Sequence, residues 1–282
     1  MISGAAALLR QQPLPSDTMC RSILGKGFRT CRVKCKLETP NGRSEISNLR
    51  SQIQDRGVRM RLNRYNNIEE LNEAAAELLT EHLHSPGLSA VMLSGGKTPL
   101  PAYEKVASSW GRLSVCLSQK AHILFSDERM VPEHSLESNY ANVHPMLTAI
   151  GISPERVIRV HTELALTEAA EKYDAELGRF LSSGGRITLG LLGLGADGHT
   201  ASLFSVGDIE RGRGRRAIPV PRTPGLDRVS VTADLLREVD RIIFLVSGEE
   251  KAHAIARFIA QDAAMPAVMA VLGHPSVEVW TA

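Results

Sequence analysis

The chain has 282 residues, of which 43% are hydrophobic, 23% charged and 4% aromatic. This is the composition of an ordinary globular protein, and it excludes disorder along the whole length. The 33 basic and 31 acidic side chains leave a formal net charge of +2, so no overall field favours a nucleic-acid or membrane partner. No uninterrupted apolar run approaches the roughly 20 residues of a transmembrane helix.

The first fifty residues differ from the rest of the chain. They carry nine basic and three acidic side chains, a local charge of +6, whereas the remaining 232 residues have a charge of −4. Residues 1–58 also lack a sustained apolar period, so we expect a basic, disordered leader outside the fold. Three interpretations stay open: a transit peptide for a plastid or mitochondrion, a mis-assigned start with translation from Met60 in a cytoplasmic protein, or a nucleic-acid-binding arm. The third is the least favoured, because the basic residues are scattered.

An amphipathic helix is the first predicted element of the folded part. Asn67 followed by Glu70 is typical of a helix N-terminus, and Pro86 with Gly87 predicts its end nearby. Helical spacing predicts a buried stripe formed by Ile68, Leu71, Ala75, Leu78, Leu79 and Leu83.

Short apolar runs then alternate with helical patterns. The runs cover residues 88–93, 121–125, 187–192 and 241–246, and each is followed by a loop and a helical stretch. This alternation predicts an α/β fold, a parallel sheet with helices on both faces. No long linker interrupts residues 60–282, so we expect a single domain there.

The loop after the first run, residues 94–99, reads Ser-Gly-Gly-Lys-Thr-Pro. In open parallel sheets, ligands bind where loops leave the carboxyl ends of strands. Two glycines allow close backbone approach, Thr98 can cap the following helix, and its N-terminal amides with Lys97 suit a phosphate group. A plain strand-to-helix turn explains the same residues. A nucleotide P-loop is disfavoured, because its first glycine would fall at Val91 inside the strand.

Three charged residues, Asp127, Glu128 and Arg129, closely follow the second run. If the strand geometry continues, Asp127 and Arg129 point to the same side and bring a carboxylate and a guanidinium together at the crevice. A solvated, salt-bridged turn is the alternative. Ser138 or Asn139 is expected to cap the next helix.

The loop over residues 193–204 follows the third run and contains glycines at 193, 195 and 198, the spacing of a dinucleotide-binding fingerprint. Two facts disfavour that interpretation. Residues 211–219 lack the acidic residue that would bind a ribose, and Asp197 would repel a pyrophosphate. The carboxylate of Asp197 can instead orient His199 as a general base, although a structural histidine remains an alternative.

Lys251 lies in the loop after the fourth run and precedes a helix over residues 252–259. Its side chain can either reach the carboxyl edge of the sheet, where the other loops lie, or remain solvated. No Gly-x-Ser-x-Gly elbow supports a covalent nucleophile. The histidines lack metal-ligand spacing, so we expect neither a metal nor a cofactor.

Taken in this order, the loops at 94–99, 127–139 and 193–204 resemble the 6-phosphogluconolactonase family, and the resemblance runs from about Met60 to Ala282. It implies a modified Rossmann-like, mostly parallel sheet, shared with glucosamine-6-phosphate isomerases and deaminases. It also implies hydrolysis of 6-phospho-D-glucono-1,5-lactone in the oxidative pentose phosphate pathway. The chain departs from the family pattern at Leu100, where a basic residue is common, and in the Arg-rich stretch 205–216.

The resemblance implies that His199, oriented by Asp197, activates water against the lactone carbonyl, and that cationic side chains bind the 6-phosphate. The expected substrate-binding set is Ser94, Gly95, Gly96, Lys97, Thr98, Asp127, Arg129, Asn139, Gly195 and Lys251. The expected partner is a phosphorylated sugar lactone, with no nucleic acid or membrane, and the protein is expected to be a monomer or small homo-oligomer. Two alternatives remain: an amino-sugar-phosphate isomerase or deaminase with Asp127 as its base, and a sugar-phosphate sensor without catalysis.

Overall fold

A computed structural model describes residues 60–110 and 117–282. The predictions made for the leader lie outside these residues. The main sheet is formed by seven strands: β1 (Met60–Arg64), β2 (Ser89–Leu93), β3 (Ala121–Phe125), β5 (Val157–Ile158), β6 (Arg186–Leu192), β9 (Ile242–Val246) and β10 (Val277–Thr281).

The seven strands are all parallel and lie in the order β1-β10-β9-β6-β2-β3-β5. The predicted parallel α/β sheet is therefore confirmed. The four predicted runs correspond to β2, β3, β6 and β9, with ends that differ by at most one residue. Strands β1, β5 and β10 were not predicted, since they lack a distinctive apolar run bounded by turn residues.

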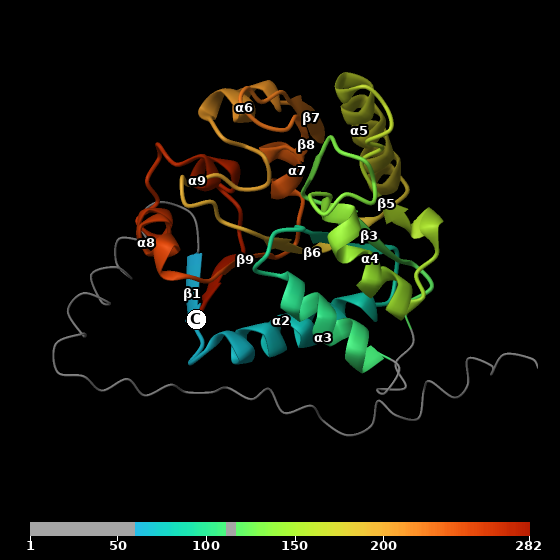
Figure 1. Cartoon of the computed structure of the whole chain (residues 1–282), viewed down its shortest axis with the longest axis horizontal. Helices are drawn as coiled ribbons and strands as arrows, with labels where there is room; N and C mark the ends of the chain where they lie inside the picture. The colour runs from blue at the N-terminus through green and yellow to red at the C-terminus, as the bar shows by residue number, and fades with distance from the viewer. Residues whose placement is uncertain (1–59, 111–116) are drawn as a thin grey trace, which may run out of the picture. The chain divides into compact units, whose positions relative to one another are not determined.

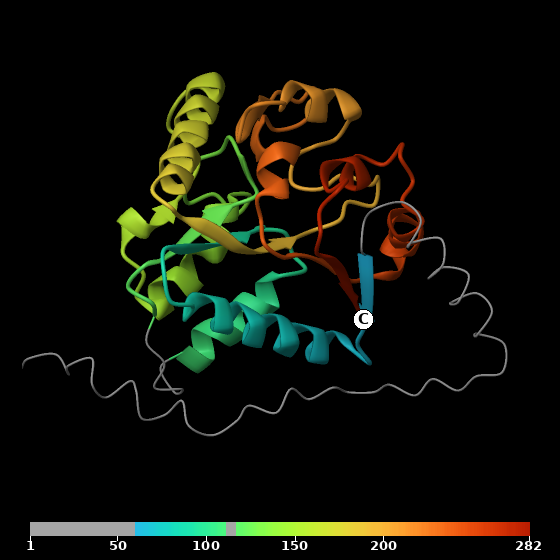
Figure 2. The same cartoon turned by 180° about the vertical axis from the view of Figure 1, so that it is seen from behind.

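Helices cover both faces of the sheet (Figures 1 and 2). One face is covered by α2 (Ile68–Leu83), α3 (Leu100–Trp110) and α4 (Asn139–Ile150). The other is covered by α5 (Leu166–Ser182), α6 (Val206–Arg211), α7 (Ala233–Arg237), α8 (Ala252–Ile259) and α9 (Pro266–Ala270).

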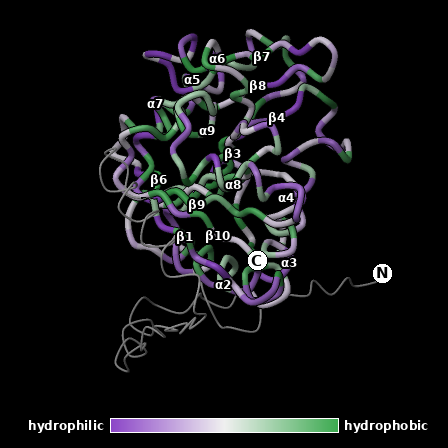
Figure 3. Tube along the Cα trace, turned by 90° about the vertical axis from the view of Figure 1, so that its left-hand side faces the viewer, coloured by the Kyte–Doolittle hydropathy of each residue, from purple (hydrophilic) through white to green (hydrophobic). Residues whose placement is uncertain are grey.

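The central strands are buried on both faces, so each contributes to two cores. In β2, Val91 and Leu93 pack with α2, α3 and α4, whereas Ala90 and Met92 pack with the opposite set of helices. This alternation follows from the two-residue period of a strand. Figure 3 shows the resulting hydrophobic stretches along the strands and hydrophilic stretches on outer turns.

The first helix largely follows its sequence signals. The Asn67 side chain accepts a hydrogen bond from the Glu70 amide at 2.9 Å, and α2 ends at Leu83. The Glu70 carboxylate accepts from the amide of Asn66 at 3.2 Å. Five of the six residues of the predicted stripe are buried, but Ile68 is 45% exposed, so that prediction is wrong. Ile68 occupies the first helical position, at the margin of the packed surface.

A second, three-stranded antiparallel sheet was not predicted. It contains β4 (Asp127–Arg129), β8 (Arg228–Val231) and β7 (Ala217–Val220), in the order β4-β8-β7. The chain passes from one sheet to the other at Ser126. The Ser126 amide donates to the Leu93 carbonyl in the main sheet at 2.8 Å, and the Ser126 carbonyl accepts from the Val231 amide in the second sheet at 2.9 Å. Asp127 therefore lies outside the main sheet, beyond the carboxyl end of β3.

Among the described helices, none combines the length and apolar character required to cross a bilayer. The longest is α5, with 17 residues, and it carries acidic and basic side chains.

The hydroxyl of Tyr173 on α5 completes the hydrogen bonding of the end of β3. It donates to the Phe125 carbonyl at 2.5 Å and accepts from the Phe125 amide at 3.1 Å. Tyr173 is fully buried. We expect Tyr173→Phe to lower the free energy of unfolding by about 1–3 kcal/mol, because it leaves a buried amide and carbonyl without partners.

Urea denaturation measures this difference. Tyr140→Phe, on the half-buried Tyr140 of α4, is the matched control and should change stability by less than about 0.5 kcal/mol. Equal stability of the Tyr173 variant and the original protein would contradict the assigned role.

Candidate functional site

The sheet order brings the predicted loops together. β6 lies between β9 and β2, and β3 follows β2, so the loop after β6 is flanked by those after β9 and β2. Among the strands of the main sheet, β3 is the next in sequence after β2 and β9 is the next after β6, and these two lie on opposite sides of the β2-β6 pair. Such a reversal of strand order opens a crevice at the carboxyl ends of the strands.

His199 and Asp197 form a close pair in the loop after β6. Nδ1 of His199 lies 2.5 Å from Oδ1 of Asp197. Burial raises the pKa of Asp197, but the hydrogen bond and charge of His199 outweigh it and hold that pKa below its ordinary value. The ionised carboxylate favours a proton on Nδ1, which leaves Nε2 as the ring nitrogen able to accept one. With 27% of its side chain exposed, His199 is accessible to a ligand.

The glycines of this loop serve the Asp197–His199 pair. A Cβ added at Gly195 would lie 2.2 Å from Nδ1 of His199 and 2.4 Å from Oδ1 of Asp197. Gly198 has a φ of 92°, and a Cβ there would meet Met265 at 2.8 Å. A dinucleotide-like glycine spacing is thus explained without a dinucleotide, because the space above Gly195 holds two side chains.

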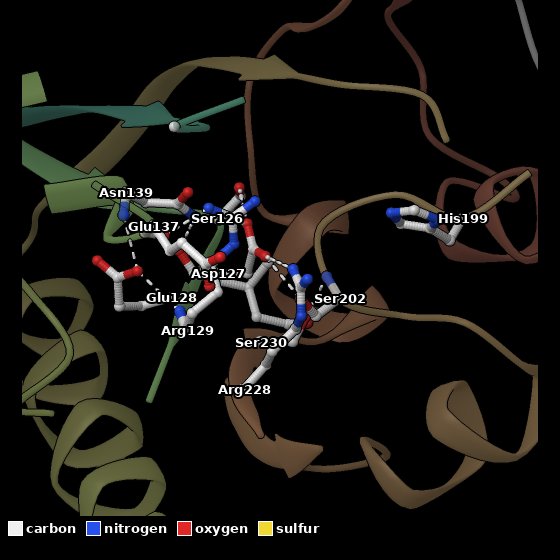
Figure 4. Close-up of polar contacts among 12 residues, drawn as sticks. Ser126, Asp127, Glu128, Arg129, Glu137, Asn139, His199, Ser202, Arg228 and Ser230 are labelled. Carbon is white, nitrogen blue, oxygen red and sulfur yellow. Dashed lines mark hydrogen bonds and ion pairs between the residues drawn. The ribbon is translucent and has the colours of Figure 1, made fainter. Parts of the chain in front are cut away.

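Asp127 is 6% exposed and lies at the centre of a hydrogen-bond network (Figure 4). Its Oδ1 accepts from Ser126 at 3.0 Å and from the Asn139 amide group at 3.2 Å, and its Oδ2 accepts from Ser202 at 2.6 Å. Nη1 of Arg228 lies 3.6 Å from Oδ2. The Ser202 contact joins the loop after β3 to the loop that carries His199.

The cation that pairs with Asp127 is therefore Arg228, and the expectation that Arg129 would sit with this carboxylate needs correction. Although β4 continues as a strand, Arg129 extends toward the next loop, where its Nη1 donates to the Glu137 carbonyl at 2.6 Å. The antiparallel register places Arg228 opposite Arg129 and Ser230 opposite Asp127. Long arginine side chains on neighbouring strands can exchange partners diagonally.

Glu128 holds the start of α4. Its carboxylate accepts from the amides of Asn139 and Tyr140, both at 2.8 Å, from the hydroxyl of Ser138 at 3.1 Å and from the amide of Arg129 at 2.7 Å. Burial raises the pKa of Glu128, although its hydrogen bonds with backbone amides oppose the shift. Sequence analysis assigned no role to Glu128. Its expectation of a cap at Ser138 or Asn139 is met by Ser138, which accepts from the Ala141 amide at 3.1 Å.

Arg228 lies close enough to two further arginines for their charges to affect it. Burial lowers the pKa of Arg228, Asp127 opposes that shift, and the charges of Arg129 and Arg222 add to it. Nε of Arg129 and Nε of Arg228 are both buried and make no hydrogen bond within the described part of the chain. The Asp127–Arg228 pair therefore lies near additional positive charge, which suits an anion.

Sequence analysis did not assign Arg222, Arg228 or Ser202 to the site. Arg222 and Arg228 flank the turn between β7 and β8, and Ser202 belongs to the loop that carries His199. The basic character of Arg228 at the start of a short strand was the available signal, but its partner Asp127 is 101 positions away in the sequence.

The first loop packs against the start of α4. A Cβ at Gly95 would lie 2.4 Å from Cα of Asn139, and the Gly95 carbonyl accepts from Asn142 at 3.2 Å. Ser94 interacts with the buried hydroxyl of Tyr103, which donates to the Ser94 carbonyl at 2.9 Å. Oδ1 of Asn139 is buried without a hydrogen-bond partner in the described residues, which is uncommon in proteins.

The remaining predicted residues lie at the edges of this arrangement. Gly96 and Thr98 are half-buried and Lys97 is exposed. Helix α3 begins at Leu100, and the Pro99 carbonyl accepts from the amide of Ala102 at 3.1 Å. Lys251 is half-buried and ends a single 3₁₀ turn, η2 (Glu249–Lys251), before α8.

Within residues 60–110 and 117–282, no three His, Cys, Asp or Glu side chains are grouped closely enough to hold a metal ion. The polar atoms without hydrogen-bond partners among the described residues include two guanidinium donors, Nε of Arg129 and of Arg228, and the amide oxygen of Asn139. These groups suit a ligand that carries both an anion and hydroxyls.

The fold and the site define a parallel α/β protein with a histidine–aspartate pair beside a cationic cluster at the strand ends. The chain belongs to the family of glucosamine-6-phosphate isomerases and 6-phosphogluconolactonases, whose model matches residues 63–280. The 6-phosphogluconolactonase of Thermotoga maritima is 35% identical over 184 residues, which cover 63% of this chain and 77% of that protein.

Two further comparisons agree with this membership. The 6-phosphogluconolactonase of a Synechocystis species is 32% identical over 209 residues, which cover 66% of this chain and 77% of that protein. The crystal structure of the Thermotoga maritima 6-phosphogluconolactonase matches with a TM-score of 0.63 at 26% identity, and it covers 79% of this chain and 100% of that one.

The contact between Gly95 and Asn139 provides a test of how the first loop is seated. We expect Gly95→Ala to lower the free energy of unfolding by about 1–3 kcal/mol, because its methyl group overlaps the backbone of α4. Gly96→Ala is the matched control, since a Cβ at Gly96 meets nothing within 4 Å. Thermal and urea unfolding measure both variants, and an equal effect of the two substitutions would contradict the predicted packing.

Proposed function

We propose that this chain is a 6-phosphogluconolactonase, which hydrolyses 6-phospho-D-glucono-1,5-lactone to 6-phospho-D-gluconate in the oxidative pentose phosphate pathway. The observation that carries the proposal is the Asp197–His199 pair, with Nδ1 and Oδ1 2.5 Å apart, on a loop joined through Ser202 to the arginines around Asp127. The names of the relatives at 32–35% identity support the choice of substrate.

In the proposed reaction, Nε2 of His199 accepts a proton from a water molecule as its oxygen attacks the lactone carbonyl carbon. The carbonyl oxygen becomes an oxyanion, which backbone amides of the glycine-rich loops can stabilise. Collapse of this intermediate breaks the bond to the ring oxygen, which takes a proton from the His199 imidazolium. The product is the open-chain acid, and no covalent enzyme intermediate is needed.

Asp197 serves this cycle in two ways. As a hydrogen-bond acceptor it fixes the tautomer in which Nε2 is basic, and as a carboxylate with a lowered pKa it stabilises the imidazolium that forms. It takes up no proton itself.

The 6-phosphate is assigned to Arg129 and Arg228, with Lys97 and Lys251 nearby, and not to Arg222. Arg129 and Arg228 present buried Nε donors that have no hydrogen-bond partner among the described residues. Lys97 and Lys251 stand on the loops after β2 and β9, on either side of the His199 loop. Binding the phosphate at a distance from the reacting carbon positions the ring over His199.

The first loop is assigned to the sugar hydroxyls. Asn139 holds one orphaned oxygen atom, and Gly95 packs directly against this residue. Ser94 precedes Gly95 on the same loop, and Gly96, Thr98 and Gly195 contribute backbone to this lining. A phosphorylated polyol ring offers the hydroxyl partner that the Asn139 oxygen lacks.

Isomerisation or deamination of an amino sugar phosphate is less well supported. That reaction was assigned Asp127 as its proton-abstracting base, yet both oxygens of Asp127 accept hydrogen bonds and its side chain is 6% exposed. Both oxygens are thus already occupied by protein donors, which leaves neither directed at a substrate. We therefore assign Asp127 the task of holding the loops and Arg228 in place.

The cellular location follows from the leader. Translation from Met60 gives a cytoplasmic enzyme, which is the location we propose, and residues 1–58 acting as a transit peptide give a plastid or mitochondrial one. The chemistry assigned to residues 60–282 is the same in either case.

Replacing the base tests the mechanism. We expect His199→Gln to lower kcat for lactone hydrolysis by about 10²- to 10⁴-fold, because general-base assistance is lost. The KM should change little, since the phosphate contacts remain. Spectrophotometric assay of freshly generated lactone, corrected for spontaneous hydrolysis, measures both. His134→Gln, on an exposed turn, is the control, and full activity of the His199 variant would contradict the assignment.

Removing one phosphate contact should affect binding instead. We expect Arg129→Gln to raise KM by about 10- to 100-fold, because a charge-assisted hydrogen bond contributes about 1.5–3 kcal/mol, while kcat falls much less. Arg179→Gln, on the exposed surface of α5 with a side chain that is 71% accessible, is the control. An unchanged KM would place the phosphate elsewhere.

A further inference from the structure

The aromatic ring of Phe204 lies against the ring of His199. The two centroids are 4.4 Å apart, and the ring planes are tilted by 42°. The guanidinium carbon of Arg222 lies 3.8 Å from the same Phe204 centroid, and that of Arg228 lies 5.6 Å away. Phe204 therefore stands between the histidine and the arginine cluster.

His199 and Arg222 both contact the ring of Phe204. The guanidinium carbon of Arg222, 3.8 Å from the ring centroid, lies over a face of the ring. The imidazole centroid, 4.4 Å away and tilted by 42°, is within aromatic contact distance. We call this arrangement of imidazole, aromatic ring and guanidinium the Phe204 stack.

The backbone of Phe204 is fixed from both sides. Leu203 is fully buried, and its amide donates to the Thr200 carbonyl at 3.0 Å. Asp208 in α6 accepts from the amides of Phe204 at 3.0 Å and of Ser205 at 2.8 Å. These contacts leave the Phe204 ring little freedom to move away from His199.

Arg222 is also held in place. Its amide donates to Oδ1 of Asp227 at 2.8 Å, which fixes the turn between β7 and β8. Phe204 and Arg222 both line a surface cavity of about 630 Å³. The half-buried Phe204 is therefore not simply a core residue, because one side of its surroundings is open.

We propose that Phe204, backed by Arg222, is a positioning residue for His199. The Asp197 hydrogen bond holds one ring nitrogen but leaves the imidazole free to rotate about that contact. The ring of Phe204 blocks this rotation and keeps Nε2 directed at the attacking water molecule. This inference rests on the proposed function, in which His199 is the base. A displacement of about 1 Å in such a group can cost about 10²-fold in rate.

Kinetics of the full chain separate positioning from binding. We expect Phe204→Leu to lower kcat by about 10- to 100-fold with KM within about twofold, because the substrate contacts are intact. Phe204→Tyr keeps the ring and should retain most of kcat. Val206→Ala, two residues further along, is the control and should match the original protein. The proposal would be overturned if Phe204→Leu and Phe204→Tyr lowered kcat equally. It would also be overturned if Phe204→Leu raised KM and left kcat unchanged.

Removing the Arg222 guanidinium tests whether it supports the ring of Phe204. Arg222→Met should lower kcat by less than Phe204→Leu and leave KM within about twofold, because the ring loses its support but stays present. A raised KM alone would show that Arg222 contacts substrate and would remove it from the positioning role. Thermal unfolding checks that each variant remains folded.

A spectroscopic measurement tests the stack without turnover. In the full chain labelled at the histidine Cε1, the His199 signal is assigned by its loss in His199→Gln. We expect the ring current of Phe204 to shift this signal, so that Phe204→Leu moves it and Phe204→Tyr leaves it near its original position. An unmoved signal in Phe204→Leu would overturn the proposal. If the original protein hydrolysed no lactone while the signal still moved, the proposed function would fail but the contact would stand.

Discussion

The arrangement of the site depends on one buried carboxylate. Asp127 accepts hydrogen bonds from Ser126, Asn139 and Ser202 and lies 3.6 Å from Arg228. These partners come from the end of β3, the start of α4, the loop after β6 and the second sheet. A charge removed from water in this way is costly unless it is paired, so the elements around it must meet in one geometry. The contact with Ser202 positions the loop that carries His199.

Three acidic residues of the site perform two different tasks because their surroundings differ. Asp127 and Glu128 are buried, at 6% and 2% exposure, and both act through hydrogen bonds to protein groups. Asp197 is exposed and contacts a single ring. A buried carboxylate with several donors holds structure together, whereas an exposed carboxylate beside an imidazole tunes that imidazole. Sequence adjacency of Asp127 and Glu128 does not reveal this division, because the two point to different partners.

The glycine-rich loop after β6 shows how one spacing can serve different chemistry. In a dinucleotide-binding protein such glycines make room for a pyrophosphate. Here the space above Gly195 is filled by Asp197 and His199, and Gly198 makes a positive-φ turn against Met265. At the end of this loop, the ring of Phe204 contacts His199 and the guanidinium groups of Arg222 and Arg228. The loop is thus a support for one imidazole, held by a carboxylate on one side and an aromatic ring on the other.

Local signals in the sequence determined much of the fold. The Asn67 cap, the run that forms β3, the Ser138 cap and the Asp197–His199 pair all involve residues within a few positions of each other. Their geometry follows from backbone period and short hydrogen bonds. The parallel direction of the strands also followed, because alternating strands and helices favour a parallel sheet.

Only the tertiary structure decided which distant groups meet. The pairing of Asp127 with Arg228, and the stacking of Phe204 with Arg222, depend on the antiparallel register of β4, β8 and β7. Those short strands have weak sequence patterns, so neither their existence nor their register was predictable. A shift of one residue would turn Arg228 to the other face. The histidine and its carboxylate were therefore visible in the sequence, whereas the cations and the aromatic ring beside them were set by long-range packing.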